Sequence, residues 1–309
     1  MQAAVRTDAL TKHYGSVVAL AGLTMSVQRG EIFGFLGPNG AGKTTAVKLL
    51  LGLARATSGE ARILGALPRD LDMRRRIGYL PELFRYQDWL TAREVLGLHC
   101  ALAGVPRGRR RGAIVECLDL VGLSTRADTR VGSYSKGMQQ RLGLAVALVN
   151  EPDVVFLDEP TSALDPVGRR DVREVLRSLQ SRGATVFLNS HMLSEVEQVC
   201  DRVAVVDRGR VVALGPLADL VGGPKRVRIA LEAETAEIHE AAARFGDVQR
   251  GAGGAIVIGG LSSDRIPDVV TALVAAGARI RSVAPESQTL EDRFLSLLHK
   301  PDDVDSDLR

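Results

Sequence analysis

The stretch that decides the fold is Gly37-Pro38-Asn39-Gly40-Ala41-Gly42-Lys43-Thr44. It follows the apolar run Ile32–Leu36 and leads into a helical pattern over Thr44–Leu53, as expected of a loop between a buried strand and a helix. Glycines let backbone N–H groups turn toward a phosphate, and the N-terminus of the next helix adds the positive end of its dipole. Because every fixed position of this pattern is present, we predict a phosphate-binding loop rather than a chance glycine-rich turn. Lys43 would bridge the outer phosphates, and the Thr44 hydroxyl would bind Mg²⁺.

A second motif is the apolar run Val154–Leu157, which is followed by Asp158 and Glu159. In a parallel sheet the carboxyl ends of the strands meet at one edge, so we expect both carboxylates to lie next to the phosphate-binding loop. Asp158 is then placed to bind Mg²⁺, and Glu159 is placed to polarise an attacking water. Alone, two acids after a strand would indicate only a solvated strand end, and the loop upstream is what favours the functional interpretation.

The rest of the first 220 residues alternates short apolar runs with helical patterns, which predicts an α/β sheet with crossover helices. Asp207-Arg208-Gly209 joins two strand-like runs and is typical of a hairpin turn at a sheet edge. The further expected strands are Thr185–Leu188 and Val203–Val206, and the further expected helices are Ile114–Val121, Met138–Leu148 and Val167–Gln180.

A change of composition at Gly222-Gly223-Pro224-Lys225 predicts a linker. Beyond it the pattern runs strand, helix, strand, strand, helix, strand and a last helix, which is typical of a small α+β ferredoxin-like domain. We therefore expect a larger domain over residues 1–222, a smaller one over 225–300, and a frayed acidic tail over 301–309.

Composition restricts the class of protein. Lys and Arg total 40 against 37 Asp and Glu, a net charge of +3, so bulk charge gives no reason to expect nucleic acid as a partner. The three cysteines, which lack C-x-x-C spacing, indicate buried free thiols in a reducing compartment. The sequence shows neither a signal-peptide pattern nor an apolar run of transmembrane length, so we expect a cytoplasmic chain that reaches a membrane only through a partner.

The segment Tyr134-Ser135-Lys136-Gly137-Met138-Gln139-Gln140-Arg141 resembles the signature of ATP-binding cassette (ABC) ATPases, usually L-S-G-G-Q-Q-Q-R. It departs from that pattern at Tyr134, Lys136 and Met138. Read alone, Ser135 would be an ordinary helix N-cap. The resemblance implies that this segment is a second phosphate cradle, which faces the γ-phosphate of ATP held by an opposite protomer.

Other segments extend the resemblance over about residues 5–220, and it implies an ABC ATPase domain with a mixed sheet and a helical signature subdomain. Ser162-Ala163-Leu164-Asp165 is similar to the family's D-loop, His191 to its switch histidine, and Tyr14 to the aromatic residue that stacks on adenine. The implied ATP contacts are Tyr14, Gly37, Pro38, Asn39, Gly40, Ala41, Gly42, Lys43, Thr44, Thr45, Ser135, Gly137, Met138 and Asp165; the implied catalytic residues are Lys43, Glu159 and His191.

One motif departs from the family pattern. Ile77-Gly78-Tyr79-Leu80-Pro81-Glu82 has a carboxylate where the family usually has the glutamine that contacts Mg²⁺, and Gln87 is a possible substitute from the same loop. With Glu82, the Mg²⁺ ligands would be Thr44, Asp158 and Glu82. The L-P-E form resembles the ATPase subunits of bacterial ABC-2-type exporters, including drug-resistance exporters, and Gln288–Phe294 resembles the last helix of their small C-terminal domain.

Two arginine runs have plainer interpretations. Arg107–Arg111 is expected to be a solvated loop, with contact to anionic lipid as the alternative, and Arg74–Arg76 is expected to be an exposed helix end.

The resemblance implies an ATPase that binds ATP and Mg²⁺, pairs with a second copy or a homologous subunit, and drives a separate polytopic permease at the cytoplasmic face of the plasma membrane, for export of a drug, lipid or other hydrophobic compound. DNA-repair and translation-factor ABC proteins are the alternatives. The first would need long coiled-coil heptads between Thr44 and Ser135, which the sequence does not show, and the second would need two cassettes in one chain.

Overall fold

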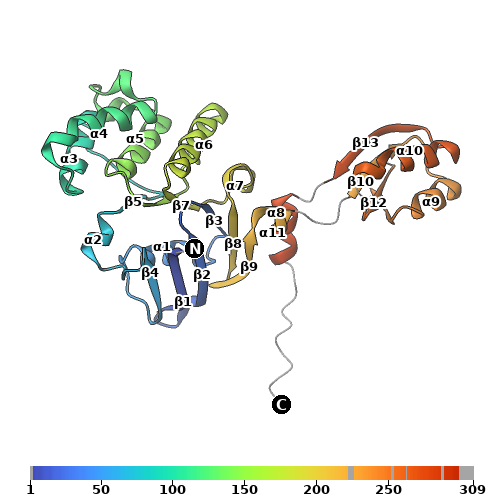
Figure 1. The fold of residues 1–309 in the computed structure, drawn as a ribbon, viewed down its shortest axis with the longest axis horizontal. Helices are drawn as coiled ribbons and strands as arrows, with labels where there is room; N and C mark the ends of the chain where they lie inside the picture. Colours follow the sequence, from blue (N-terminus) through green and yellow to red (C-terminus); the bar gives the residue numbers. More distant parts are fainter. Residues whose placement is uncertain (1–2, 222–225, 252–253, 262, 287–288, 299–309) are drawn as a thin grey trace, which may run out of the picture. The chain divides into compact units, whose positions relative to one another are not determined.

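The computed structural model describes residues 3–221, 226–251, 254–261, 263–286 and 289–298 (Figure 1). The chain divides into two compact units, Met1–Leu217 and Ala218–Arg309. The expected linker Gly222–Lys225, Gln288 and the tail 301–309 lie outside the described residues.

The first unit is built on a six-stranded mixed sheet, which confirms the expected α/β class. Its strand order is β5 (Ile77–Leu80), β6 (Val154–Asp158), β7 (Thr185–Asn189), β3 (Ile32–Leu36), β8 (Arg202–Asp207) and β9 (Arg210–Pro216). The first five strands run parallel, and β9 returns antiparallel to β8 through the expected hairpin. In that turn Arg208 and Gly209 have φ of 45° and 76°, the left-handed conformation that such turns need.

The strand order separates the two strands that carry the predicted site. β6, which ends in Asp158, is not the neighbour of β3, because β7 pairs with both and separates them. The carboxylates still leave the same edge of the sheet as the phosphate-binding loop, but the end of β7 lies between them.

A second, antiparallel sheet was not predicted from the sequence. β1 (Ala3–Tyr14) pairs with β2 (Val17–Gln28) and with β4 (Ser58–Ile63). Register shifts along β1, among them one at Ala9 with φ of 46°, interrupt the two-residue alternation by which a half-buried strand is recognised.

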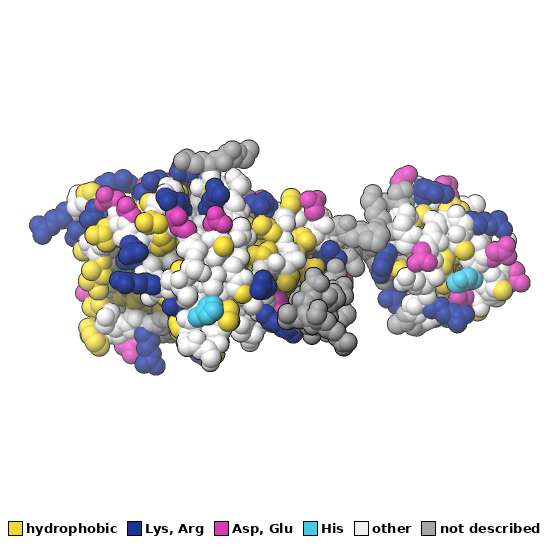
Figure 2. Space-filling view, turned by 90° about the horizontal axis from the view of Figure 1, so that it is seen from below, with side chains coloured by type: hydrophobic (Ala, Val, Ile, Leu, Met, Phe, Trp, Pro, Cys, Tyr) yellow, Lys and Arg dark blue, Asp and Glu magenta, His cyan; other side chains and the backbone are white. Residues whose placement is uncertain are grey.

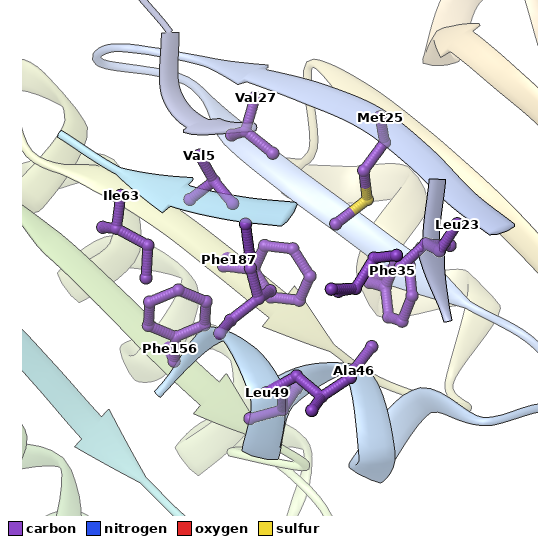
Figure 3. Packing of buried hydrophobic residues seen from close by; sticks show 14 of the residues in the cluster. Val5, Leu23, Met25, Val27, Phe35, Ala46, Leu49, Ile63, Phe156 and Phe187 are labelled. Carbon is purple, nitrogen blue, oxygen red and sulfur yellow. The ribbon is translucent and has the colours of Figure 1, made fainter. Parts of the chain in front are cut away.

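A single hydrophobic core joins the two sheets and helix α1 (Lys43–Leu50). Phe187 lies at its centre, with ring centroids 5.1–5.7 Å from those of Phe156, Phe35 and Phe33. Figure 3 shows Val5, Met25 and Ile63 of the antiparallel sheet on one side of these rings and Ala46 and Leu49 of α1 on another. The strands beneath the phosphate-binding loop are therefore fixed by contacts from the antiparallel sheet and from α1.

Helices α3 (Ala92–Leu102), α4 (Arg107–Leu120) and α5 (Lys136–Leu148) pack together as a helical subdomain, while α6 (Pro166–Ser181), α7 (Leu193–Val199) and short α2 (Leu71–Arg74) complete the unit. Short α8 (Leu217–Val221) begins at the last residue of this unit and continues into the second. The expectation of a loop at Arg107–Arg111 was wrong, because these residues form the first turns of α4. Pro106 has the φ that suits a helix start, arginine is a good helix former, and Arg110 donates to the Val105 carbonyl. The exposed helix end at Arg74 is confirmed, since α2 ends there.

The second unit is an antiparallel sheet in the order β11 (Asp247–Gly251), β12 (Ala255–Gly259), β10 (Arg226–Leu231) and β13 (Ile280–Glu286). Helices α9 (Ala236–Ala243) and α10 (Ile266–Ala275) connect the strands in the βαββαβ order, and α11 (Leu290–Leu298) follows. Val227, Ile229 and Leu273 belong to a hydrophobic core that this unit has of its own. The ferredoxin-like topology predicted from the sequence is confirmed.

The surface carries both signs of charge, and the face seen in Figure 2 shows basic and acidic side chains interspersed on each unit. All three cysteines are free and buried. Within the ranges that the structure describes, no helix has both the length and the apolar character needed to cross a bilayer.

Candidate functional site

The phosphate-binding loop is held by glycines that no other residue replaces easily. Gly40 and Gly42 have φ of 83° and 99°, in the left-handed region, and Gly42 is the N-cap of α1. A Cβ on Gly42 would lie 2.3 Å from the Ala19 carbonyl oxygen, and one on Gly37 would lie 2.3 Å from that of Val206. The loop is thus pressed against β2 and β8, and Thr44 and Thr45 stand in the first turn of α1.

Lys43 lies at the centre of this region. Its Nζ donates hydrogen bonds to the carbonyl oxygens of Gly37, at 2.7 Å, and Pro38, at 3.1 Å. Burial lowers the pKa of Lys43, against the charges of Glu159, Asp158 and Glu82, which raise it. We call Lys43, Asp158, Glu159 and Glu82 the Lys43 cluster. The Lys43 ammonium and each of the three carboxylates attract one another at the edge of the sheet where the parallel strands end.

Asp158 is buried at the end of β6, and Asn189 Nδ2 at the end of β7 donates to its Oδ1 at 2.5 Å. Burial raises the pKa of Asp158; the Asn189 hydrogen bond and the charge of Lys43 oppose this rise, and the charges of Glu82 and Glu159 add to it. The ionised form of Asp158 is therefore less stable at this position than it would be in water, and its neighbours offset that cost only in part.

The side-chain oxygen atoms of Asp158 and Asn189 suit a hydrated Mg²⁺ ion. Asn189 Oδ1 is buried beside Asp158 without a hydrogen-bond partner, so it is an acceptor suited to a water of the metal's shell. Among the described residues, no three His, Cys, Asp or Glu side chains gather as a metal cage. Mg²⁺ usually keeps several waters and takes few protein ligands beside substrate phosphates, so the Asp158 carboxylate with the Asn189 amide oxygen suits it.

Glu159 directly follows Asp158 and has φ of 53°, an uncommon left-handed conformation for a residue other than glycine. Its Oε1 accepts a hydrogen bond from the backbone N–H of His191 at 2.8 Å and lies 2.8 Å from His191 Nδ1. Ser190 Oγ donates to the other carboxylate oxygen at 3.4 Å. The loop after β7 therefore holds the Glu159 carboxylate in place and brings His191 to it.

The signature residues form a second group. Ser135 caps α5, since its Oγ accepts from the Met138 N–H at 3.2 Å, and Asp165 caps α6, since its Oδ1 accepts from the Gly168 N–H at 2.8 Å. Ser135, Gly137, Met138 and Asp165 line one cavity, whose lining includes no member of the Lys43 cluster. The two predicted phosphate cradles are thus built at different places on the chain.

Tyr14 and the loop after β5 complete the predicted site residues. Tyr14 ends β1 with 48% of its surface exposed, and the Lys12 ammonium lies 4.7 Å from its ring centroid. Glu82 is exposed and its charge acts on both Lys43 and Asp158, whereas Gln87 lines a cavity with Trp89 and Gln139.

Three polar residues of this site were not predicted from the sequence: Asn189, Ser190 and Gln140. All three are buried, and each has a hydrogen bond to Asp158 or Glu159. Asn189 and Ser190 follow an apolar strand just as Asp158 and Glu159 do, and that repeated pattern was the available signal. Gln140 had no such signal beyond its place in the signature.

Comparisons with known proteins agree with this geometry. The family model for ABC transporters matches residues 20–162. An uncharacterized ABC transporter ATP-binding protein of Synechocystis is 41% identical over 92% of this chain and 79% of its own length. The bacitracin transport ATP-binding protein of Bacillus licheniformis is 40% identical over 78% of each chain. A dimeric ATP-binding cassette solved with ADP and Pi superposes with a TM-score of 0.63 at 28% identity, covering 69% of this chain and 98% of the other.

Two aspartates at opposite ends of β6 give a paired test of the electrostatics. Asp158→Asn should raise the free energy of unfolding at neutral pH, because burial makes the native carboxylate costly and the Asn189 hydrogen bond can remain. Since the folded-state pKa of Asp158 is raised, the native charge costs stability above that pKa, and the benefit of Asn should shrink as pH falls through it. Urea unfolding of both proteins across pH measures this.

Asp153→Asn is the matched control. The hydrogen bonds from Arg76 to Asp153 lower the pKa of that carboxyl, so its charge is stabilising and the same change should cost up to about 1 kcal/mol. A loss of stability in Asp158→Asn as large as that in Asp153→Asn would contradict this account of Asp158.

Proposed function

This chain is a member of the ABC transporter family and an ATP-hydrolysing transporter subunit, and from that premise we propose how its residues divide the work. The Lys43 cluster binds Mg²⁺–ATP, the chain pairs with a second copy or a homologous subunit around two nucleotides, and the pair drives a separate membrane permease. The single observation that carries this proposal is the strand topology: the loop after β3, which leads to Lys43, and the end of β6, which carries Asp158 and Glu159, leave the same edge of the sheet.

The residues suggest the following roles. Backbone N–H groups from Gly40 to Thr45 cradle the phosphates, and Lys43 exchanges its loop carbonyl partners for phosphate oxygens. Thr44 and Asp158 hold Mg²⁺, which when bound offsets the phosphate charge. Glu159 accepts a proton from the attacking water at its carboxylate, and His191 holds that carboxylate and reaches toward the γ-phosphate. Tyr14 offers its exposed ring to adenine.

A second copy supplies what a single chain keeps apart. Ser135, Gly137, Met138 and Asp165 line a cavity that includes none of the Lys43 cluster, so we propose that they serve the nucleotide of the partner. The N-terminus of α5 offers N–H groups and a positive dipole end to the γ-phosphate there. The dimeric cassette bound to ADP and Pi supports this arrangement.

The loop after β5 suits a permease as partner. Leu83 is 88% exposed and Trp89 is 70% exposed, which is unusual for large apolar side chains unless another surface covers them. A polytopic permease would place the chain at the cytoplasmic face of the plasma membrane. Relatives named for the export of Nod factor and of fluoroquinolones support export, and the latter supports a drug or other hydrophobic compound as the cargo. No described feature favours a DNA-repair or translation role.

The second unit is proposed to serve dimer contact or regulation rather than nucleotide binding. It has a core of its own, and every proposed ATP contact lies in residues 1–222.

Glu159→Gln tests the core of the proposal. ATP binding should persist while hydrolysis falls by at least about a hundred-fold, since an amide is a poor base, and the trapped nucleotide should hold a dimer that sizing with ATP detects. Lys43→Ala is the companion variant, which should lose ATP binding and therefore the dimer. A Glu159→Gln protein that hydrolyses ATP at the wild-type rate, or stays monomeric with ATP and permease, would contradict the proposal.

Glu82→Ala tests the proposed role of Glu82 in Mg²⁺ binding. We propose that Glu82 binds Mg²⁺ directly or through a water. The charge of the metal would then offset the repulsion between the carboxylates of Glu82 and Asp158. The change should raise the Mg²⁺ concentration needed for half-maximal hydrolysis and weaken stimulation by the permease, whereas Glu82→Gln should keep much of both. Gln87→Ala is the parallel variant: if it shows these effects and Glu82→Ala does not, Gln87 fills the role.

A chain ending at Gly222 tests the division of labour. Because the first unit contains its own core and all proposed ATP contacts, the truncated chain should bind ATP with a Kd within about three-fold of the full chain, by calorimetry. A folded fragment, shown by a cooperative thermal transition, that no longer binds ATP would place nucleotide contacts in the second unit.

A further inference from the structure

The side chain of Gln140 connects helix α5 to Glu159 of the same chain. Gln140 lies in the first two turns of α5 and is only 6% exposed. Its Nε2 donates a hydrogen bond to the backbone carbonyl oxygen of Glu159 at 3.3 Å. Among the described residues, this contact is the hydrogen bond that the buried Gln140 amide nitrogen makes.

The acceptor belongs to a residue whose backbone needs to be held. Glu159 has φ of 53°, a conformation that persists only where the surroundings over-determine it. Its carbonyl also accepts from Ser162, from Oγ at 3.1 Å and from the backbone N–H at 3.3 Å, and its own N–H donates to the Asn189 carbonyl at 2.9 Å. Gln140 is the one of these partners that comes from the helical subdomain, and the others belong to the sheet edge and the loop after it.

We propose that Gln140 is a positioning residue for hydrolysis, which fixes the direction of the Glu159 carboxylate by anchoring the Glu159 carbonyl to α5. The inference rests on the proposed role of Glu159 as the base. The side chain of Glu159 leaves the same Cα whose carbonyl Gln140 holds, so a rotation of that peptide moves the carboxylate away from His191 and from the attacking water.

The bond also links the two predicted phosphate cradles through one chain. α5 begins at its N-cap Ser135, which stands in the signature cavity, and Gln140 follows on the same helix. When the N-terminus of α5 closes on a nucleotide, the rigid helix and the Gln140 hydrogen bond transmit that movement to the Glu159 carbonyl. The signature of one site thereby influences the base of the other.

A substitution that keeps length but removes the donor tests the proposal. Gln140→Met should lower kcat of ATP hydrolysis about ten-fold, while the ATP Kd, measured by calorimetry, stays within two-fold of wild type. Gln180→Leu is the matched control, because it removes a glutamine hydrogen bond of 2.6 Å, to Asp201, that does not involve Glu159. If Gln140→Met does not fold, Gln140→Asn withdraws the amide by one methylene and keeps a polar side chain.

Combination with Glu159→Gln separates positioning from a general structural effect. If Gln140 acts through Glu159, Gln140→Met should lower the residual rate of Glu159→Gln by less than two-fold. A ten-fold loss in both backgrounds, a kcat equal to wild type, or a fall in ATP affinity that matches the fall in rate would each overturn the proposal. Wild-type hydrolysis by Glu159→Gln alone would instead overturn the role of Glu159, which is a separate outcome.

Discussion

The structure depends on keeping the half-buried Lys43 ammonium and three carboxylates at a single edge of a sheet. Burial works against each charge at Lys43 and Asp158, since it lowers the pKa of the lysine and raises that of the aspartate. Their mutual attraction opposes these shifts but does not cancel them. Such a cluster is poor at stabilising an isolated chain and well suited to bind a ligand that carries both signs, as a metal–nucleotide complex does. Function here conflicts with stability, as is common at catalytic sites.

The remainder of the first unit offsets this cost by apolar packing directly behind the site. Phe187 precedes Asn189 by two residues on β7, and its ring packs on Phe156, which precedes Asp158 by two residues on β6. Side chains two residues apart on a strand point to the same face, so the core fixes the strand ends that carry Asn189 and Asp158. The antiparallel sheet matters for the same reason, because Val5, Met25 and Ile63 close the core around these rings (Figure 3).

How far the sequence predicts this structure depends on whether a signal is local. The phosphate-binding loop, the acids after β6 and the βαββαβ order follow from short patterns, and the structure contains each of them where expected. β1 was missed because its register shifts break the alternation, and the arginines of α4 were assigned to a loop because charge was weighed above helix propensity. The contacts of Asn189 and Gln140 join residues 31 and 19 positions apart, so only the strand order and the packing of α5 reveal them.

The strand order itself explains why Asn189 and His191 belong to the site. With β7 between β3 and β6, the chain that leaves β7 has to pass between the phosphate-binding loop and the two acids. The backbone of this segment makes two hydrogen bonds to Glu159: the Asn189 carbonyl accepts from the Glu159 N–H, and the His191 N–H donates to the Glu159 carboxylate. Glu159 is therefore bound at both its backbone and its side chain by one short segment, Asn189–His191. Glu159 holds its left-handed φ while it makes both contacts, so the segment that follows β7 supplies part of the surroundings that such a conformation needs to persist.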